Sequence, residues 1–366
     1  MFSELGQGDP NGNWMVCAGD SADFDEGQIN DVVITILEGS PASAADLHLP
    51  MVIVGFPPEP EIDVTPTALT QAMDPDSSTT QDITIANLPS AGADLNWNIS
   101  EVTVPGYLFI DKPQSSTSGF ASDFFIPDSA GVYISDDMTI SGNASISTMS
   151  FPGFVNNQDI GDIASSVTLQ IYNDAAGEPA GHPDDGLSSF LFELTLPVGD
   201  ANLDLTNDII TFDILGANAA TLDLTPGLYW VTVFPNNDAA FGATDRWNWF
   251  TGTVTNTTDS LFIDPSDLFT AGLTTWGDLA TALGNPDFAS MSYTAAGDLS
   301  CGAPWLTYSS TSNPGGTAPG DSDVVTVTFD STGLAPGDYV ANICINSDDS
   351  DEALVPVAVN LTVNGP

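Results

Sequence analysis

Short segments with the pattern of β-strands follow one another along almost the whole chain. Apolar and polar residues alternate within them, as in 324–330 (VVTVTFD) and 355–363 (VPVAVNLTV), and clusters of Gly, Pro, Asn and Asp separate them. Alternation with a period of two gives a strand one apolar face, and these turn residues let the chain reverse direction. Many short strands at even spacing predict an all-β fold of antiparallel β-sandwiches.

More than one sandwich is expected. The chain has 366 residues, of which 42% are hydrophobic, and this is enough to bury two or three cores. The clearest linker is 55–66 (GFPPEPEIDVTP), because proline lacks an N–H donor and favours extended backbone. One helix-like pattern, 265–283, starts at Ser266 or Asp267 and is interrupted by glycines, so we expect only short helical turns there.

The charge of the chain restricts its partners. Fifty acidic residues stand against two basic ones, a formal net charge of -48. Phosphate backbones and anionic membrane surfaces would be repelled, so we expect no nucleic-acid partner. No apolar run approaches the roughly 18 residues that membrane insertion needs. Only nine of the acids are Glu; Asp favours turns and is a hard oxygen ligand, which points to loops and to Ca²⁺.

The cysteines and the composition suggest a location. Three cysteines fit an oxidising exterior with one disulfide and one spare thiol, and a reduced interior is the alternative. The scarcity of Lys and Arg also favours an extracellular or cell-surface protein. Residues 1–14 contain neither the basic nor the apolar region of a signal peptide. We therefore expect the chain to be a processed piece of a secreted protein.

Two separated stretches, 60–104 and 292–364, share one family pattern. The first contains IDVTP, ITIAN and DLNW, and the second contains CGAPWL, VTVTFD, GLAPGDYVANIC and VPV. This order resembles an immunoglobulin-like repeat of secreted bacterial proteins, found in C-terminal regions of subtilisin-like proteases and in surface proteins. The resemblance implies one discontinuous sandwich interrupted by residues 105–291. It also implies a disulfide between Cys301 and Cys344, which occupy the cysteine positions of the pattern.

The interrupting segment, 105–291, has a resemblance of its own. Its motifs include ASDFFIP, MSFPGFVNN, VTLQIYNDAAGEPAG, LDLTPGLYWVTVF and RWNWF. They are similar to a jelly-roll-like module of extracellular marine bacterial proteins. That resemblance implies an eight-stranded double-sheet sandwich inserted into the immunoglobulin-like one.

Residues 1–56 are expected to be a partial domain with its linker. The stretch 12–36 is similar to the closing strands of the P-domain, which follows the catalytic domain in proprotein convertases and bacterial subtilisins. The match is carried by Gly12, Trp14, Asp20, Asp25 and Gly27. The preceding strands are absent, and a lone hairpin is marginal in water. We therefore expect residues 10–37 to dock on another subunit, with folding back onto its own chain as the alternative.

The same region contains a candidate metal site. Asp20, Asp23 and Asp25 lie in a short turn that ends in Gly27, and convergent carboxylates can bind Ca²⁺. The alternative is a solvated acidic loop without a metal. Cys17, in the preceding strand-like run, is left over, and we expect it to be either a free thiol or the former partner of a missing upstream segment.

Catalytic motifs are missing. The two histidines, His48 and His182, lie in no metalloprotease motif, and the chain has no phosphate-binding loop or serine-hydrolase elbow. The segment around His182 reads as a surface turn, and no nucleophile is nearby in the sequence. We therefore expect no enzyme, although a distant carboxylate pair for glycoside hydrolysis stays open.

Two tryptophans give a candidate ligand site. Trp247 and Trp249 alternate, so in a strand they share one face. Exposed, they could stack on sugar rings; buried, they would fill a sandwich core together with Trp230. Arg246 is the only arginine, and we expect it to hold an Asp-rich loop through a bidentate pair.

These observations favour a non-catalytic extracellular structural or adhesion protein that presents β-sandwich surfaces and self-assembles into a fibre or surface layer. One alternative is the C-terminal accessory region of a secreted subtilisin-like protease. Another is a carbohydrate-binding module whose partners are glycans.

Overall fold

The computed structural model describes residues 59–365 except 244 and 254–258. The chain divides into two units between Gly55 and Phe56, and the described residues belong to the second. Strands in antiparallel sheets dominate this part and its helices are few and short, which confirms the predicted all-β fold. None of the helices in the described ranges is long and apolar enough to cross a membrane.

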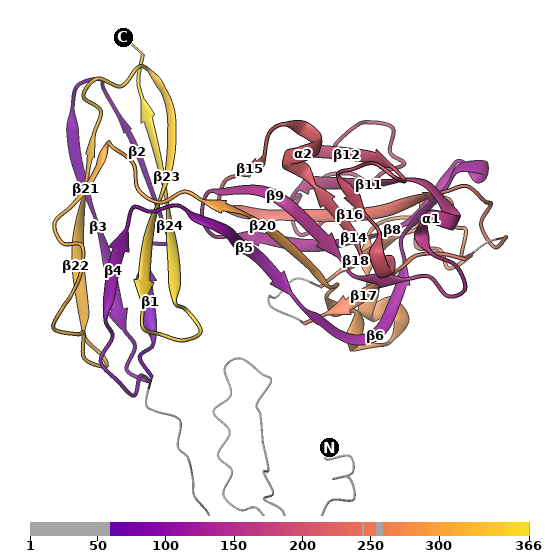
Figure 1. Cartoon of the computed structure of the whole chain (residues 1–366), viewed down its shortest axis with the longest axis horizontal. Coiled ribbons are helices and arrows are strands. Elements are labelled where there is room, and N and C mark those ends of the chain that lie inside the picture. The colour runs from indigo at the N-terminus through magenta and orange to yellow at the C-terminus, as the bar shows by residue number, and fades with distance from the viewer. Residues whose placement is uncertain (1–58, 244, 254–258, 366) are drawn as a thin grey trace, which may run out of the picture. The chain divides into compact units, whose positions relative to one another are not determined.

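A first sandwich consists of two four-stranded sheets, in the orders β1-β3-β22-β21 and β2-β24-β23-β4 (Figure 1). Its strands are β1 (Ile62–Thr65), β2 (Ala68–Met73), β3 (Ser78–Asn87), β4 (Trp97–Ser100), β21 (Leu306–Tyr308), β22 (Ser322–Asp330), β23 (Gly337–Ser347) and β24 (Leu354–Val363). Alternate residues are buried in most of these strands, whereas β23 buries the run 341–345 and β24 the run 357–359. The buried apolar side chains form one cluster that includes Ile85, Val327, Ile343 and Val359. We call this the outer sandwich.

The chain enters the outer sandwich at one end and leaves it at the other. β1 pairs antiparallel with β3, and after Pro66 the chain crosses to the opposite sheet, where β2 runs parallel to β24. Because β1, β2 and β24 run the same way, the first strand starts at one pole and the last strand finishes at the other (Figure 1).

The strands between β4 and β21 form a second body, which we call the insert. Its sheets have the orders β12-β11-β16-β7-β8-β18-β19, β13-β14-β9-β20-β5 and β10-β17-β6, and β15 also pairs with β9. The longer strands are β5 (Val104–Lys112), β6 (Gln114–Ala121), β8 (Ala130–Ile140), β9 (Ala144–Phe151), β11 (Ala164–Asn173), β12 (Phe192–Pro197), β16 (Gly227–Asn237), β17 (Asn248–Gly252) and β20 (Tyr293–Leu299). The shorter ones are β7 (Asp123–Phe125), β10 (Gly153–Phe154), β13 (Leu203–Asp204), β14 (Ile210–Asp213), β15 (Leu222–Leu224), β18 (Leu261–Ile263) and β19 (Gly277–Asp278).

One cluster of buried apolar side chains joins the sheets of the insert. It combines residues of the larger sheet, such as Val132 and Val231, with residues of the smaller ones, such as Met149 and Trp249. The helices α1 (Ile160–Ile163), α2 (Ile214–Asn218) and α3 (Leu279–Leu283) lie in its connections.

The expected helical region, 265–283, differs in detail from the prediction. α3 covers only its last residues, and its N-cap is Asp278, whose carboxylate accepts the Thr281 N–H, in place of Ser266 or Asp267. Upstream, Asp264 accepts the N–H groups of Leu268 and Phe269, which holds that stretch in a turn. Side chains of this kind compete with helix formation because they bond to the nearby backbone.

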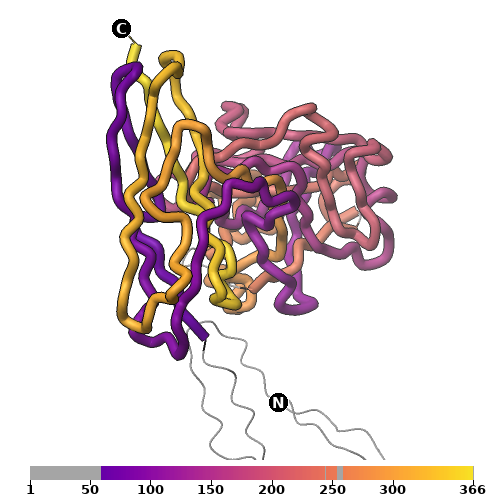
Figure 2. Tube along the Cα trace, turned by 60° about the vertical axis from the view of Figure 1, so that its left-hand side comes forward, coloured from indigo at the N-terminus to yellow at the C-terminus, as the bar shows by residue number. Residues whose placement is uncertain are grey.

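Both chain connections between the outer sandwich and the insert lie next to each other, because β5 and β20 pair antiparallel with Val104 opposite Leu299 (Figure 2). The sequence pattern places 292–300 in the second half of the outer sandwich. The structure instead pairs β20 with β5 and β9 inside the insert. The same alternating pattern suits a strand in either sheet, so the pattern cannot fix this boundary.

Polar and covalent links lie at this junction. Cys301 follows β20 and is joined to Cys344 of β23, with their Cα atoms 5.5 Å apart. Asn143, in the turn between β8 and β9, donates its N–H to the Asn342 side-chain oxygen at 2.7 Å, and Asn342 Nδ2 donates to the Asn143 carbonyl at 2.9 Å.

Candidate functional site

A fully buried ionic cluster lies between two sheets of the insert. Lys112 is the last residue of β5, and Asp136 and Asp137 lie in β8. Only 1% of Lys112 is exposed, and neither aspartate is exposed at all. Lys112 Nζ lies 2.9 Å from Asp136 Oδ2 and 2.6 Å from Asp137 Oδ1, and it also donates to the Asp137 carbonyl at 2.9 Å.

The surroundings of this cluster are fixed by further hydrogen bonds. The Tyr293 hydroxyl donates to the Asp137 carbonyl at 2.6 Å, and the Lys112 ammonium lies 5.3 Å from the Tyr293 ring centroid. Met291 N–H donates to Asp136 Oδ2 at 3.2 Å. Two buried oxygens, Asp136 Oδ1 and Asp137 Oδ2, have no hydrogen-bond partner among the described residues.

Two carboxyl groups share one amine in this cluster. Burial raises the pKa of Asp136 to about 6, because a charge in apolar surroundings is poorly solvated, and Lys112 only partly offsets this. Burial alone would lower the pKa of Lys112, but the two carboxylates outweigh it and raise that pKa. The Asp136 carboxyl therefore keeps its proton to a higher pH than an exposed aspartate does, because burial raises its pKa.

Asp123 is a second buried acid. Its Oδ1 accepts Trp247 N–H at 3.4 Å and Asn237 Nδ2 at 3.5 Å, and its Oδ2 has no partner among the described residues. Burial raises the pKa of this carboxyl to about 7, and the charge of Arg246 opposes the rise only weakly.

Replacing Asp123 with asparagine should stabilise the protein at alkaline pH. The unfolded carboxyl loses its proton near pH 3.8, whereas the folded one keeps it to about pH 7. The unfolded state therefore binds fewer protons in this window, and Asp123 makes stability fall as pH rises through it. The variant should gain on the order of 3 kcal/mol over wild type at pH 8 and little at pH 4.

Urea unfolding at pH 4, 6 and 8, followed by circular dichroism, measures this difference. Asp162→Asn, at an exposed position, is the control and should change little at any pH. Equal unfolding free energies of wild type and Asp123→Asn at pH 8 would contradict the expected burial effect.

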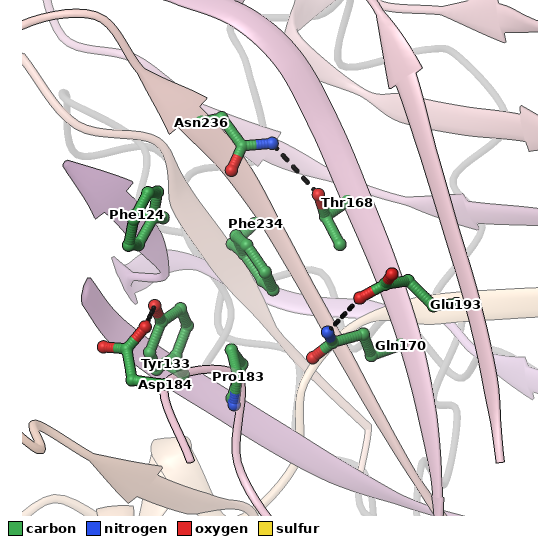
Figure 3. Close-up of a pocket in the computed structure, with 9 residues that line it drawn as sticks. All are labelled: Phe124, Tyr133, Thr168, Gln170, Pro183, Asp184, Glu193, Phe234 and Asn236. Carbon is green, nitrogen blue, oxygen red and sulfur yellow. Dashed lines mark hydrogen bonds between the residues drawn. The ribbon is translucent and has the colours of Figure 1, made fainter. Parts of the chain in front are cut away.

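A cleft of about 240 Å³ opens on the face of the seven-stranded sheet that lies opposite the main core (Figure 3). Its lining residues come from β7, β8, β11, β12, β16 and the 183–184 loop: Phe124, Tyr133, Thr168, Gln170, Pro183, Asp184, Glu193, Phe234 and Asn236. Tyr133 and Phe234 pack edge to face with ring centroids 4.9 Å apart. The cleft therefore combines aromatic rings with polar side chains.

Hydrogen bonds order the polar residues of the cleft (Figure 3). The Tyr133 hydroxyl donates to Asp184 Oδ1 at 2.7 Å, and Gln170 Nε2 donates to Glu193 Oε2 at 2.6 Å. Asn236 Nδ2 donates to Thr168 Oγ1 at 3.0 Å. Glu193 is exposed, so its carboxylate can reach a ligand from the rim.

The predicted sugar-stacking site is not formed by the two tryptophans. Trp247 and Trp249 are fully buried in the insert core. Trp247 Nε1 donates to the Asp208 carbonyl at 3.0 Å, and Trp249 Nε1 donates to the Ser292 carbonyl at 2.6 Å. The alternative, a packing role, is therefore correct for both, because neither ring offers a free face to a ligand.

The expected ion pair of Arg246 is also wrong. Its guanidinium lies over the rings of Phe241 and Phe269, 5.4 and 5.1 Å from their centroids. Across the described ranges, both ion pairs belong to Lys112. Arg246 therefore stabilises this loop through cation–π contacts rather than through a carboxylate.

Several predictions lie outside the described residues. They are the Ca²⁺ ligands Asp20, Asp23 and Asp25, the unpaired Cys17 and the docking segment 10–37. Within the part of the chain that the structure describes, no group of three or more His, Cys, Asp or Glu side chains is placed to hold a metal ion.

No feature of the sequence predicts the buried cluster of Lys112, Asp136 and Asp137. Asp136 and Asp137 are two of fifty acidic residues, and nothing in their spacing marks them. The one available signal is Lys112, the only lysine of the chain, at the end of an alternating strand.

Comparison with protein-family models and with curated proteins finds no match for this chain.

Proposed function

We propose that this protein is a non-catalytic structural or adhesion protein of the extracellular space or cell surface. One observation carries the proposal, namely that the chain enters the outer sandwich at one pole and leaves it at the other, with its second strand, β2, paired in parallel with its last strand, β24. A domain with this connectivity can stand in a row with others along one axis.

The pairing of β2 with β24 resists a pull between the two poles of the outer sandwich. The register runs from Ala68 opposite Ala358 to Met73 opposite Val363. β2 and β24 run in the same direction. Tension between the two poles therefore slides one strand along the other, so that all the hydrogen bonds between them resist the force together. Tension perpendicular to the strands would instead open such bonds one at a time. The geometry therefore suits a domain that carries force between a surface and a partner.

The charge of the chain supports an extracellular setting. A net charge of -48 makes copies of the protein repel each other at low ionic strength. At physiological salt the range of this repulsion falls to about 8 Å, the Debye length. Copies would then approach closely only through specific contacts. We propose that residues 10–37 supply such a contact and that Asp20, Asp23 and Asp25 bind Ca²⁺.

Glycan binding is the second candidate function, and the cleft on the seven-stranded sheet favours it. Aromatic rings beside amide and carboxylate groups can pack against a sugar ring and bond to its hydroxyls. Phe124 contributes a partly exposed ring, and Gln170 and Glu193 contribute polar groups. In this second candidate function, the insert is the module that binds the glycan.

Light scattering and electron microscopy of the full chain test the proposal, with a glycan array as the second arm. We expect an assembly of several copies in salt and Ca²⁺, and a monomer after deletion of residues 1–56. Circular dichroism of the deletion variant controls for folding. A monomeric full chain, or an assembly that survives the deletion, would overturn self-assembly through residues 10–37. Glycan binding that Glu193→Ala abolishes would establish the second candidate instead.

A further inference from the structure

Lys112 is the only lysine of the chain and is buried almost completely. Long basic side chains usually keep their charged group in water, so a buried lysine needs a specific reason. Here the side chain extends from β5, in the six-stranded sheet, to β8, in the seven-stranded sheet. Its amine therefore links the two largest sheets of the insert.

The amine is held beside one carboxyl group in particular. Nζ lies 2.6 Å from Asp137 Oδ1 and donates to the carbonyl of the same residue at 2.9 Å. Asp137 Oδ2 is buried without a partner. These two contacts with Asp137 fix the position of Nζ, and burial excludes water from the site. The amine and the Asp137 carboxyl are therefore held at the short distance that favours an intramolecular reaction between them.

Asp136 occupies a different position in the cluster. Its Oδ2 accepts from Lys112 Nζ at 2.9 Å and from Met291 N–H at 3.2 Å, and the Ser290 hydroxyl lies 3.4 Å away. These bonds keep the carboxyl in place while it remains in contact with the amine. A carboxyl group held in this way can accept a proton from the amine and return it.

We propose that Lys112 Nζ and Asp137 Cγ condense in the folded protein to an intramolecular isopeptide bond, with Asp136 as the group that transfers the proton. The product is an amide that connects β5 to β8 covalently and ties the two sheets together.

The reaction balances without a cofactor. A proton first moves from the Lys112 ammonium to the Asp137 carboxylate, which leaves a neutral amine and a protonated Asp137 while Asp136 stays ionised. Burial by itself favours these uncharged forms, and the step works against the ion pairing that raises the Lys112 pKa. Nζ then attacks Asp137 Cγ. Asp136 accepts the proton from the nitrogen and returns it to a hydroxyl on Cγ, which departs as water. One N–C bond forms, one C–O bond breaks, one water is released, and nothing is oxidised or reduced.

The raised pKa of Asp136, about 6, supports this role, because a proton-transfer group works best when its pKa lies near the working pH. The reaction also replaces a buried ammonium and a buried carboxylate by one neutral amide. Charged groups destabilise the folded state when they are buried, so the condensation has a driving force within the site.

Mass spectrometry of the intact, full-length protein tests the bond. We expect wild type, reduced and denatured, to be lighter than its sequence mass by one water molecule. Lys112→Arg, which keeps the positive charge, should show its full sequence mass. Since Lys112 is the only lysine, an amine-reactive label on denatured wild type should modify the α-amino group alone. This second measurement separates the bond from loss of water elsewhere in the chain.

Peptide mapping and one further variant test the assigned roles. The linked peptides should join Lys112 to Asp137, and Asp136→Asn, folded by circular dichroism, should keep its full mass and a reactive Lys112. Wild type with full sequence mass and a labelled Lys112 would overturn the proposal. A link to Asp136 would overturn the choice of Asp137, and undiminished bond formation in Asp136→Asn would overturn the role of Asp136.

Discussion

Replacing Trp249 with alanine is expected to lower the free energy of unfolding of the insert by about 3 to 5 kcal/mol, the range for large aromatic residues removed from a core. The ring is fully buried and packs edge to face against Phe151 and Tyr293, with centroids 5.5 and 6.2 Å away. Its loss would leave a cavity and would also deprive the Ser292 carbonyl of its donor.

Urea unfolding followed by circular dichroism measures this effect, and two variants refine it. Trp249→Phe keeps most of the ring and removes the N–H group, so it should cost less than the alanine variant, about 1 to 3 kcal/mol. Leu187→Ala, at a side chain that is 79% exposed, is the control and should stay within about 0.5 kcal/mol of wild type. A loss as small as that of Leu187→Ala would contradict the buried position of Trp249.

The strand pattern of the sequence predicts much of the fold. The alternating segment 324–330 lies within β22, and 355–363 lies within β24. In both, the residues on one face are buried, because the period of two assigns alternate side chains to the core. Local pattern suffices here since each of these strands faces one core.

The same pattern cannot tell which face is covered. The alternation of Trp247 and Trp249 predicts that they share a face, but their burial depends on Phe151, Tyr293 and other residues distant in the sequence. Arg246 illustrates the same limit, because its partners Phe241 and Phe269 are brought together only by the fold. Contacts between sheets, which decide such sites, leave no periodic signal.

The buried cluster shows why the candidate site could not be predicted from the sequence. Lys112 meets Asp136 and Asp137 only because β5 and β8 belong to sheets that face each other across the core. In a chain with fifty acids, no local feature separates these two from solvated ones. The sequence contains a single lysine, and that lysine lies in a strand. The structure explains this position, because the two carboxylates of Asp136 and Asp137 pair with the buried amine.

Removing the link between Cys301 and Cys344 is expected to destabilise the outer sandwich by about 4 kcal/mol. The bond closes a loop with a sequence separation of 43 residues, and a loop of that length restricts the unfolded chain by roughly this amount. Both residues are buried next to Leu299 at the junction with the insert. Alanine is the suitable replacement for both, because serine would bury two hydroxyl groups.

Hydrogen exchange followed by mass spectrometry can measure the loss in the outer sandwich and in the insert separately. In a Cys17→Ser background, which prevents thiol exchange, Cys301→Ala with Cys344→Ala should speed the exchange of β23 and β24 far more than that of β11 and β16. β23 carries Cys344 and pairs with β24, whereas β11 and β16 pair with each other inside the insert. Treating the Cys17→Ser protein with a reducing agent should reproduce the effect of the double variant. Equal acceleration in the outer sandwich and in the insert would mean that the two unfold as one cooperative unit. Unchanged exchange in β23 would contradict the stabilising role of the disulfide.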